Sequence, residues 1–366
     1  MRFLGKGELN DGGNAVVDVW TRDGAKVADP YSLDFEVFDK TTGTPTSIIA
    51  RAPVDIANDY PTGDKIGVGH FAPRFTVPGG ANKGLHEVRF YLRQNDGDAE
   101  SQFAFDFDVL DAAFKPPSRV YALLSDVRAE DIPETQANDA RVLRSLVLAS
   151  QQIERFTDRS FGPQGKQILV DGRDSPDLLL EEPIIALEKI EVRSHAFGAD
   201  FEISETDIDD LGVYNRHITQ GLTDPDDRDN PKLSFFRLYD YLGATYRDDE
   251  RPLFPNYVFP FGQQNVALQG VFGYTDPDGS PTGSVPELIR QACVLLAGRL
   301  VDKRFSGTST SVPAGPIVEE KTRDQSVKYA SAGSSTGGAA FGPFTGDPEI
   351  DNILLMYSRG TRLGAA

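Results

Sequence analysis

The chain has 366 residues and a formal net charge of −19, with 37 lysine and arginine residues against 56 aspartate and glutamate residues. This acidic balance excludes a protein that holds nucleic acid or anionic membranes through a basic surface. Hydrophobic residues make up 39%, enough for the cores of about two or three domains, and the only cysteine, Cys293, excludes a disulfide framework or a cysteine-based zinc site. The chain turns polar soon after its start and has no apolar stretch of membrane-spanning length, so we expect a cytosolically made protein without a secretion signal.

Residues 15–110 carry the alternating pattern of half-buried strands. Apolar residues recur at every second position, as in Phe103, Phe105, Phe107 and Val109, and turn residues such as Asn95-Asp-Gly97 separate the segments. About seven short strands in about 110 residues are typical of a β-sandwich. The sequence therefore predicts an immunoglobulin-like sandwich over residues 1–113.

Two prolines in Phe114-Lys-Pro-Pro117 mark the expected domain boundary. Beyond it, apolar residues at helical spacing predict helices over 135–159 and 285–305, and a β-rich stretch lies between them at 166–274. We therefore expect an α+β multidomain chain in which the sandwich is followed by a helical-bundle domain over 114–305 that carries a β insertion.

The helix over 135–159 gives this acidic chain one basic element. Four arginines lie among its apolar positions: Arg141, Arg144, Arg155 and Arg159. They form either a solvated helix face or a contact with acidic residues of a neighbouring subunit.

Residues 306–366 are expected to form an extended arm. The stretch 306–346 is rich in Gly, Ser, Thr and Ala, with one predicted strand at 326–329, and cannot bury enough apolar surface alone. A short helix then begins at Asp347-Pro-Glu349 and carries an apolar stripe of Ile350, Ile353, Leu354 and Tyr357. Since a helix of this length is marginal by itself in water, its stripe either docks on a partner or folds back onto its own domain.

No catalytic constellation is evident in the sequence. The four histidines are widely spaced, and hydrolase, nucleotide and dinucleotide motifs are missing, so we expect no catalytic residue, no metal and no cofactor. The acidic segment 224–230 offers oxygen ligands that calcium prefers, but it lacks the glycine and the distal glutamate of an EF-hand loop. A solvated acidic turn is the alternative.

Four segments of the second half, in this order, resemble the head-tail connector adaptor proteins of tailed bacteriophages. The first is an acidic turn and amphipathic helix at 121–161, and the second is the strand segment 178–192. The third joins the strand and Gly-Phe-Gly-Tyr turn at 265–276 to the helix 285–305, and the fourth pairs the strand near 326–330 with the helix at 346–360. Three features depart from the family pattern: such adaptors are often much shorter, the acidic stretch at about 194–262 looks like an insertion, and the sandwich is added.

The resemblance implies a structural virion protein and not an enzyme. Such proteins form a ring of about twelve copies under the portal, extend the DNA channel and provide the attachment site for the tail. The implied partners are other copies of the chain, the portal protein and a stopper or tail-terminator protein, with double-stranded DNA passing through unbound and no membrane involved. The implied location is the head-tail junction of the virion, after synthesis in the host cytoplasm.

Within this hypothesis we assign roles to three sets of residues. Ile350, Ile353, Leu354 and Tyr357 would dock on the portal, so that a chain truncated before Gly346 should fold normally yet fail to bind it. The four arginines of the first helix would contact neighbouring subunits. Acidic residues would face the channel and repel DNA, unless the charge serves solubility alone. The candidates for this role are Asp224, Asp226, Asp227 and Asp229.

Two other functions remain as alternatives. A carbohydrate- or host-surface-binding phage module would use exposed aromatic residues of the sandwich, but Trp20 is the only tryptophan. A glycosidase would need two carboxylates converging in a cleft. We also expect the sandwich to project outward as a separable unit.

Overall fold

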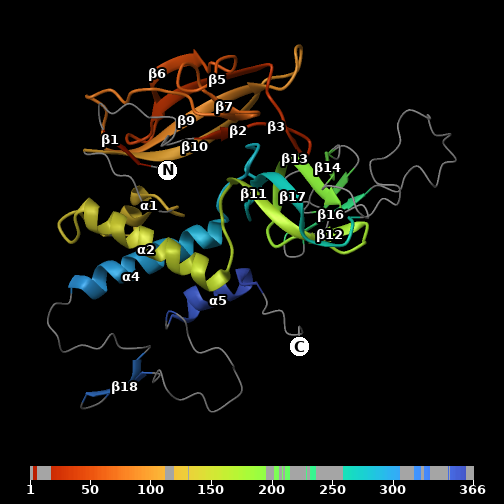
Figure 1. The fold of residues 1–366 in the computed structure, drawn as a ribbon. Coiled ribbons are helices and arrows are strands. Elements are labelled where there is room, and N and C mark those ends of the chain that lie inside the picture. Colours follow the sequence, from red (N-terminus) through yellow and green to blue (C-terminus); the bar gives the residue numbers. More distant parts are fainter. Residues whose placement is uncertain are drawn as a thin grey trace.

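The chain folds into two β regions and a group of helices (Figure 1). The computed structural model describes residues 3–5, 18–111, 119–130, 132–194, 202–205, 208, 211–214, 228, 231–235, 259–305, 317–322, 325–329, 345 and 347–359. The linker 114–118 lies outside these residues.

The N-terminal region consists of two sheets around a shared core. The larger has the strand order β1 (Phe3–Gly5), β10 (Ser101–Leu110), β9 (Gly84–Arg93), β5 (Ser32–Asp39) and β6 (Thr46–Pro53). The smaller has the order β2 (Val19–Trp20), β8 (His70–Phe71) and β7 (Lys65–Gly67). Side chains of both sheets meet in one hydrophobic cluster, as Phe71 of β8 does with Phe35 and Phe90. The alternating pattern thus produces the expected strands, and the Asn95-Asp-Gly97 turn joins β9 to β10.

The middle region contains a second large sheet. Its order is β11 (Gln164–Gly172), β17 (Gly262–Phe272), β13 (Ile184–Ser194), β4 (Lys26–Val27) and β3 (Arg22–Asp23), and β14 (Glu202–Glu205) pairs with β13. A smaller sheet, in the order β12 (Asp177–Leu179), β16 (Lys232–Phe235) and β15 (Leu211–Tyr214), shares its hydrophobic core.

Strands β3 and β4 connect the two regions. They belong to the N-terminal segment, but β4 runs parallel to β13, and the Leu187 N–H donates to the Ala25 carbonyl oxygen at 2.8 Å. The Arg22 side chain also donates to the Pro281 carbonyl oxygen at 2.6 Å. Contrary to our expectation, the N-terminal segment is therefore not a separately projecting unit, because part of it completes the middle sheet.

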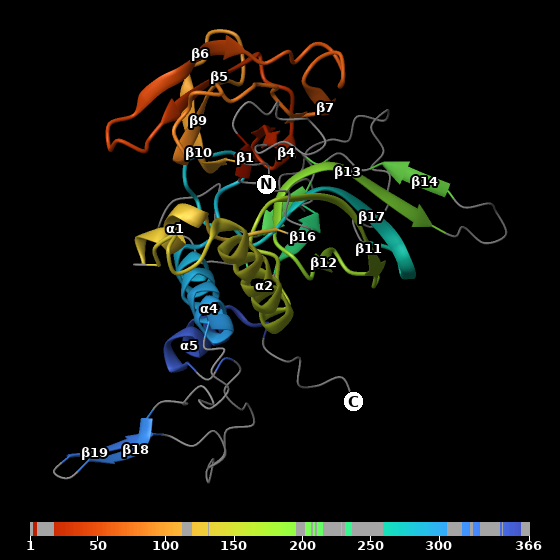
Figure 2. The same ribbon diagram turned by 90° about the vertical axis from the view of Figure 1, so that its left-hand side faces the viewer.

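The helices α1 (Leu124–Ala129), α2 (Asp139–Thr157), α4 (Glu287–Phe305) and α5 (Pro348–Tyr357) form one packed group beside the middle sheet (Figure 2). Helix α2 begins where the Asn138 side chain accepts a hydrogen bond from the Arg141 N–H at 3.1 Å, and it ends at Asp158, which has a left-handed φ of 53°. Both long helices lie where their apolar spacing predicts them.

The predicted fold class is wrong in its central part. Among the described residues, strand residues outnumber helical ones, 39% against 22%, and only four helices occur. Between α2 and α4 the described residues are mainly β and build their own hydrophobic core around Leu187, Leu268 and Phe272. This sheet region is a principal part of the fold and not an insertion in a helical bundle.

Candidate functional site

Helix α5 covers a surface formed by α2 and α4, as both views show (Figures 1 and 2). Ile350 and Leu354 are fully buried there, Ile353 is 8% exposed, and Tyr357 packs at the edge of the same cluster. The stripe that we assigned to portal docking is therefore occupied within its own chain. This corresponds to the alternative in which the helix folds back, and burial removes Ile350, Ile353 and Leu354 from contact with a second protein.

Polar contacts fix both ends of α5. At its beginning, the Asp347 carboxylate forms an ion pair with Arg299 of α4 at 3.0 Å and accepts a hydrogen bond from the Glu349 N–H at 2.9 Å. Beyond its end, the Arg359 N–H donates to the carbonyl oxygen of Thr157, at the end of α2, at 3.1 Å. Helix α5 is thus held by capping and pairing contacts as well as by its apolar stripe.

An aromatic cluster lies where α5 meets the middle sheet. Phe161 follows α2, Tyr274 belongs to the turn after β17, and Tyr357 ends α5; their ring centroids are 5.6–5.9 Å apart and the rings meet edge to face. Arg159 and Arg228 both lie over the Tyr274 ring, at 4.9 and 4.3 Å from its centroid. Three segments far apart in sequence therefore converge on one tyrosine.

The four arginines of the basic helix do not share one environment. Arg141 donates to the Val301 carbonyl oxygen at 2.9 Å, and Arg159 packs on Tyr274, so both act within the chain. Arg144 and Arg155 are exposed. Only these two are available for the subunit contact that we assigned to all four.

The acidic residues assigned to a channel wall, Asp224, Asp226, Asp227 and Asp229, lie outside the described residues. Arg228 between them is described, and it forms an ion pair with Asp276 at 2.6 Å and a hydrogen bond to the Thr275 carbonyl oxygen at 2.8 Å. The loop is thereby attached at this residue to the turn between β17 and α4. The channel-wall assignment stays a prediction.

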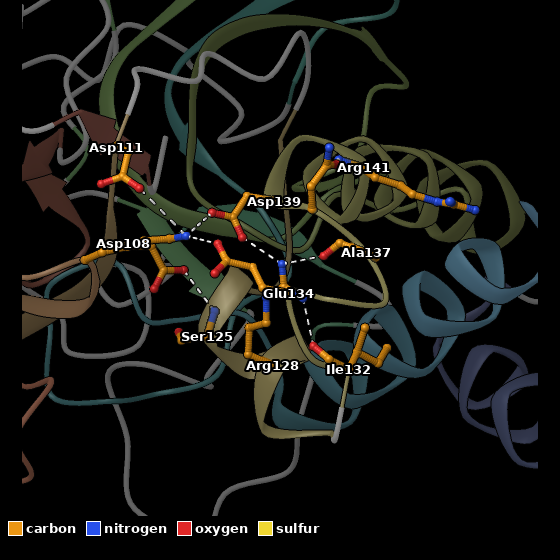
Figure 3. A network of polar contacts seen from close by, with 11 residues as sticks. Asp108, Asp111, Ser125, Arg128, Ile132, Glu134, Ala137, Asp139 and Arg141 are labelled. Carbon is orange, nitrogen blue, oxygen red and sulfur yellow. Dashed lines mark hydrogen bonds and ion pairs between the residues drawn. The ribbon is translucent and has the colours of Figure 1, made fainter. Parts of the chain in front are cut away.

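A polar network joins the N-terminal sheets to the helices (Figure 3). Lys83, just before β9, contacts Glu134 and forms an ion pair with Asp139 of α2 at 2.6 Å; a more distant carboxylate, Asp111, lies at 4.0 Å. Arg128 of α1 forms an ion pair with the same Asp139 at 2.7 Å. We call Lys83, Arg128, Glu134 and Asp139 the polar junction.

The charges of the polar junction stabilise one another. Burial alone would raise the pKa of Asp139, but hydrogen bonds from Lys83 and Arg128 outweigh it and lower that pKa. Burial alone would likewise lower the pKa of Lys83, yet its hydrogen bonds to Asp139 and Glu134 raise it. The stabilisation from Asp139 is therefore present above the ordinary carboxyl pKa and is lost as the pH falls through the lowered value.

A double-mutant cycle tests this junction. We expect Lys83→Met and Asp139→Asn to show a coupling energy of about 0.5–2 kcal/mol in denaturant unfolding, because their charges lie in contact and are partly shielded from water. Lys83→Met with Asp111→Asn is the matched control, since the Asp111 side chain is 71% exposed and 4.0 Å away, and should show almost none. Equal coupling in both cycles would contradict a specific Lys83–Asp139 contact.

Sequence patterns do not reveal the polar junction. Lys83 and Asp139 are 56 positions apart, and single charged residues in a turn or at a helix start look like ordinary surface groups. Strands β3 and β4 are also missed, because each has only two residues. Asp139 in the first turn of a predicted helix is the one available signal, and it indicates capping and not a partner.

The described residues offer little for catalysis. No three His, Cys, Asp or Glu side chains among them could hold a metal ion together. His70 stacks on Trp20 at 3.8 Å, and burial lowers its pKa to about 4; His195 and His217 lie outside the described residues. Cys293 is fully buried, and this burial raises the pKa of its thiol to about 11, so the reactive thiolate is disfavoured.

Comparisons with known proteins do not identify a family for this chain. The chain matches no protein-family model, and no curated protein matches it. Among the described residues, no helix combines the length and the apolar character needed to cross a membrane.

Proposed function

We propose that the chain is a structural head-tail connector subunit of a tailed bacteriophage, which forms a ring under the portal, extends the DNA channel and gives the tail its attachment site. The observation that supports this most is the convergence of the four segments that carry the resemblance. Phe161, Tyr274 and Tyr357, from the first, third and fourth segments, meet ring to ring. The second segment contains β13, which pairs with β17 of the third. The first three segments and the helix of the fourth thus form one physical unit, whereas the strand of the fourth segment lies in the separate β18–β19 hairpin, β18 being Ile317–Thr322 and β19 Gln325–Tyr329.

The buried stripe of α5 changes where we place the portal contact. Leu355 and Met356 lie on the outward side of the same helix and are 46% and 71% exposed. We assign the contact to these two side chains, because exposed neighbouring apolar residues gain most from burial against a partner. In a ring, many weak contacts of this kind act together and hold the joint.

Binding to the portal protein of the same virus tests the proposal. The wild-type chain is expected to form a ring that sediments with the portal and lies coaxially on it in negative-stain images. The variant Leu355→Lys/Met356→Lys should stay folded and bind at least about tenfold more weakly, a change of about 1.4 kcal/mol per contact site. Ile66→Lys/Val68→Lys alters two apolar residues of similar exposure in and beside β7 and should bind like the wild type. A portal that does not bind the wild-type chain would refute the proposal.

The rival carbohydrate-binding function has less support. Its best aromatic platform, Trp20, is half-buried, stacks on His70 and packs against the cluster around Ile185. A sugar ring would need that indole face free.

A further inference from the structure

The hairpin of β18 (Ile317–Thr322) and β19 (Gln325–Tyr329) pairs only with itself within the described part of the chain. Both views place it away from the helices and the sheets (Figures 1 and 2). A two-stranded hairpin is at best marginally stable alone in water, because its outer N–H and C=O groups have no strand to pair with. Among the described residues, the hairpin therefore has no partner sheet.

Strand β11 (Gln164–Gly172) offers an open sheet edge of the complementary kind. Its nine residues pair with β17 on one side, and no strand is described on the other. Leu169 on this strand is 48% exposed. The strand ends at Gly172, where a Cβ would overlap the Pro260 carbonyl oxygen, so Phe261, which is 81% exposed, lies close to the same end. A long, mostly uncharged edge with exposed apolar neighbours is the kind of edge to which another strand adds.

The hairpin and the β11 edge lie apart from each other in both views (Figures 1 and 2). The first residues of helix α4 lie near the middle sheet, and the hairpin follows the last residues of this helix along the chain, in agreement with Figure 1. Nineteen helical residues separate these points by about 28 Å. The eleven residues from 306 to 316 span at most about 40 Å when fully extended, so returning to the edge in the same chain would use about 70% of that length even along a straight line.

Two different patches that lie apart on one subunit are what a head-to-tail interface requires, and such an interface closes into a ring when the rotation fits. We infer that the β18–β19 hairpin of one copy adds to the β11 edge of a second copy, so that the sheet continues from subunit to subunit. The occupant of the edge is thus another copy of this chain. This inference rests on the proposed ring and names the contact that would close it.

Two single-sided variants test the inference. The first, Leu169→Lys, keeps the hairpin and puts a charge on the edge; the second replaces residues 317–329 by a Gly-Ser linker of equal length and keeps the edge. We expect the wild type to be oligomeric in analytical ultracentrifugation and each variant to be monomeric, with an unchanged circular dichroism spectrum. The decisive sample is their mixture, which should form a dimer with one copy of each, because only one intact hairpin and one intact edge remain to pair. Ile66→Lys, at a β7 residue with 42% exposure, is the matched control and should assemble like the wild type.

The outcomes separate this inference from the proposed function. A hairpin-deleted chain that still forms rings and binds the portal would overturn the hairpin contact and leave the connector function standing. A mixed dimer together with a wild-type ring that does not bind the portal would support the hairpin contact and overturn the connector function. A wild type that stays monomeric at its highest soluble concentration, or two monomeric variants that do not combine, would overturn the inference.

Discussion

Replacing Leu354 by alanine is expected to lower the free energy of unfolding by about 2–5 kcal/mol, whereas Leu355→Ala should lower it by less than about 1 kcal/mol. The two leucines are neighbours on α5, but Leu354 is fully buried in the cluster with α2 and α4, and Leu355 is 46% exposed. The first substitution leaves a cavity between three helices, and the second removes atoms that water already reaches. The pair therefore measures whether α5 is part of the core.

Urea unfolding followed by two probes provides the measurement. Circular dichroism at 222 nm reports on the helices, and the fluorescence of Trp20, the only tryptophan, reports on the N-terminal sheets. A chain truncated before Gly346 should show an even larger loss than Leu354→Ala, which replaces our earlier expectation that such a truncation folds normally. Equal, small effects at both leucines would mean that α5 does not stay docked.

The parts of the fold that sequence patterns predicted are those set by local periodicity. The alternation around Phe103–Val109 produces β10, and the helical spacing around Leu146 produces α2. The strength of the two long helical patterns, however, led to a helical-bundle prediction. Periodicity reports the type of an element and not how much of the domain it forms, so the share of β11, β13 and β17 was underestimated.

The candidate site was predicted less well than the fold. The stripe at Ile350 and Leu354 was correctly predicted as an apolar face. A sequence cannot say whether the surface that covers this face belongs to the same chain or to a second protein, because burial against either one removes the same apolar area from water. Arg141 and Arg155 likewise look equivalent on a helix, although the first bonds to the Val301 carbonyl oxygen and the second is exposed. Long-range packing decides both cases.

Asp108→Asn is expected to stabilise the chain at pH 8 and to lose this advantage at pH 4. Asp108 of β10 is 1% exposed and faces α1, where its Oδ2 accepts a hydrogen bond from the Ser125 N–H at 3.2 Å. Its Oδ1 and the Ser125 Oγ are buried without a partner among the described residues. Burial raises the pKa of Asp108 from 3.8 to about 6, although the hydrogen bonds from Ser125 and Leu124 act in the opposite direction.

The sign of the effect follows from linkage. Because the pKa is raised on folding, the native state binds the proton more tightly than the unfolded state, and stability falls as the pH rises from about 4 to about 6. A shift of this size corresponds to about 3 kcal/mol at most, so the difference in unfolding free energy between Asp108→Asn and the wild type should grow by about 1–3 kcal/mol from pH 4 to pH 8. Asparagine can still accept from the Ser125 N–H, and its amide can donate to the Ser125 hydroxyl.

Urea unfolding at several pH values measures the contribution of the raised Asp108 pKa to stability. The control is Asp111→Asn, which also removes one negative charge from a chain of net charge −19. The Asp111 side chain is 71% exposed, so any general charge effect appears in both variants. A stability difference for Asp108→Asn that stays constant across the pH range would show that folding does not raise the pKa of Asp108, and it would contradict this prediction.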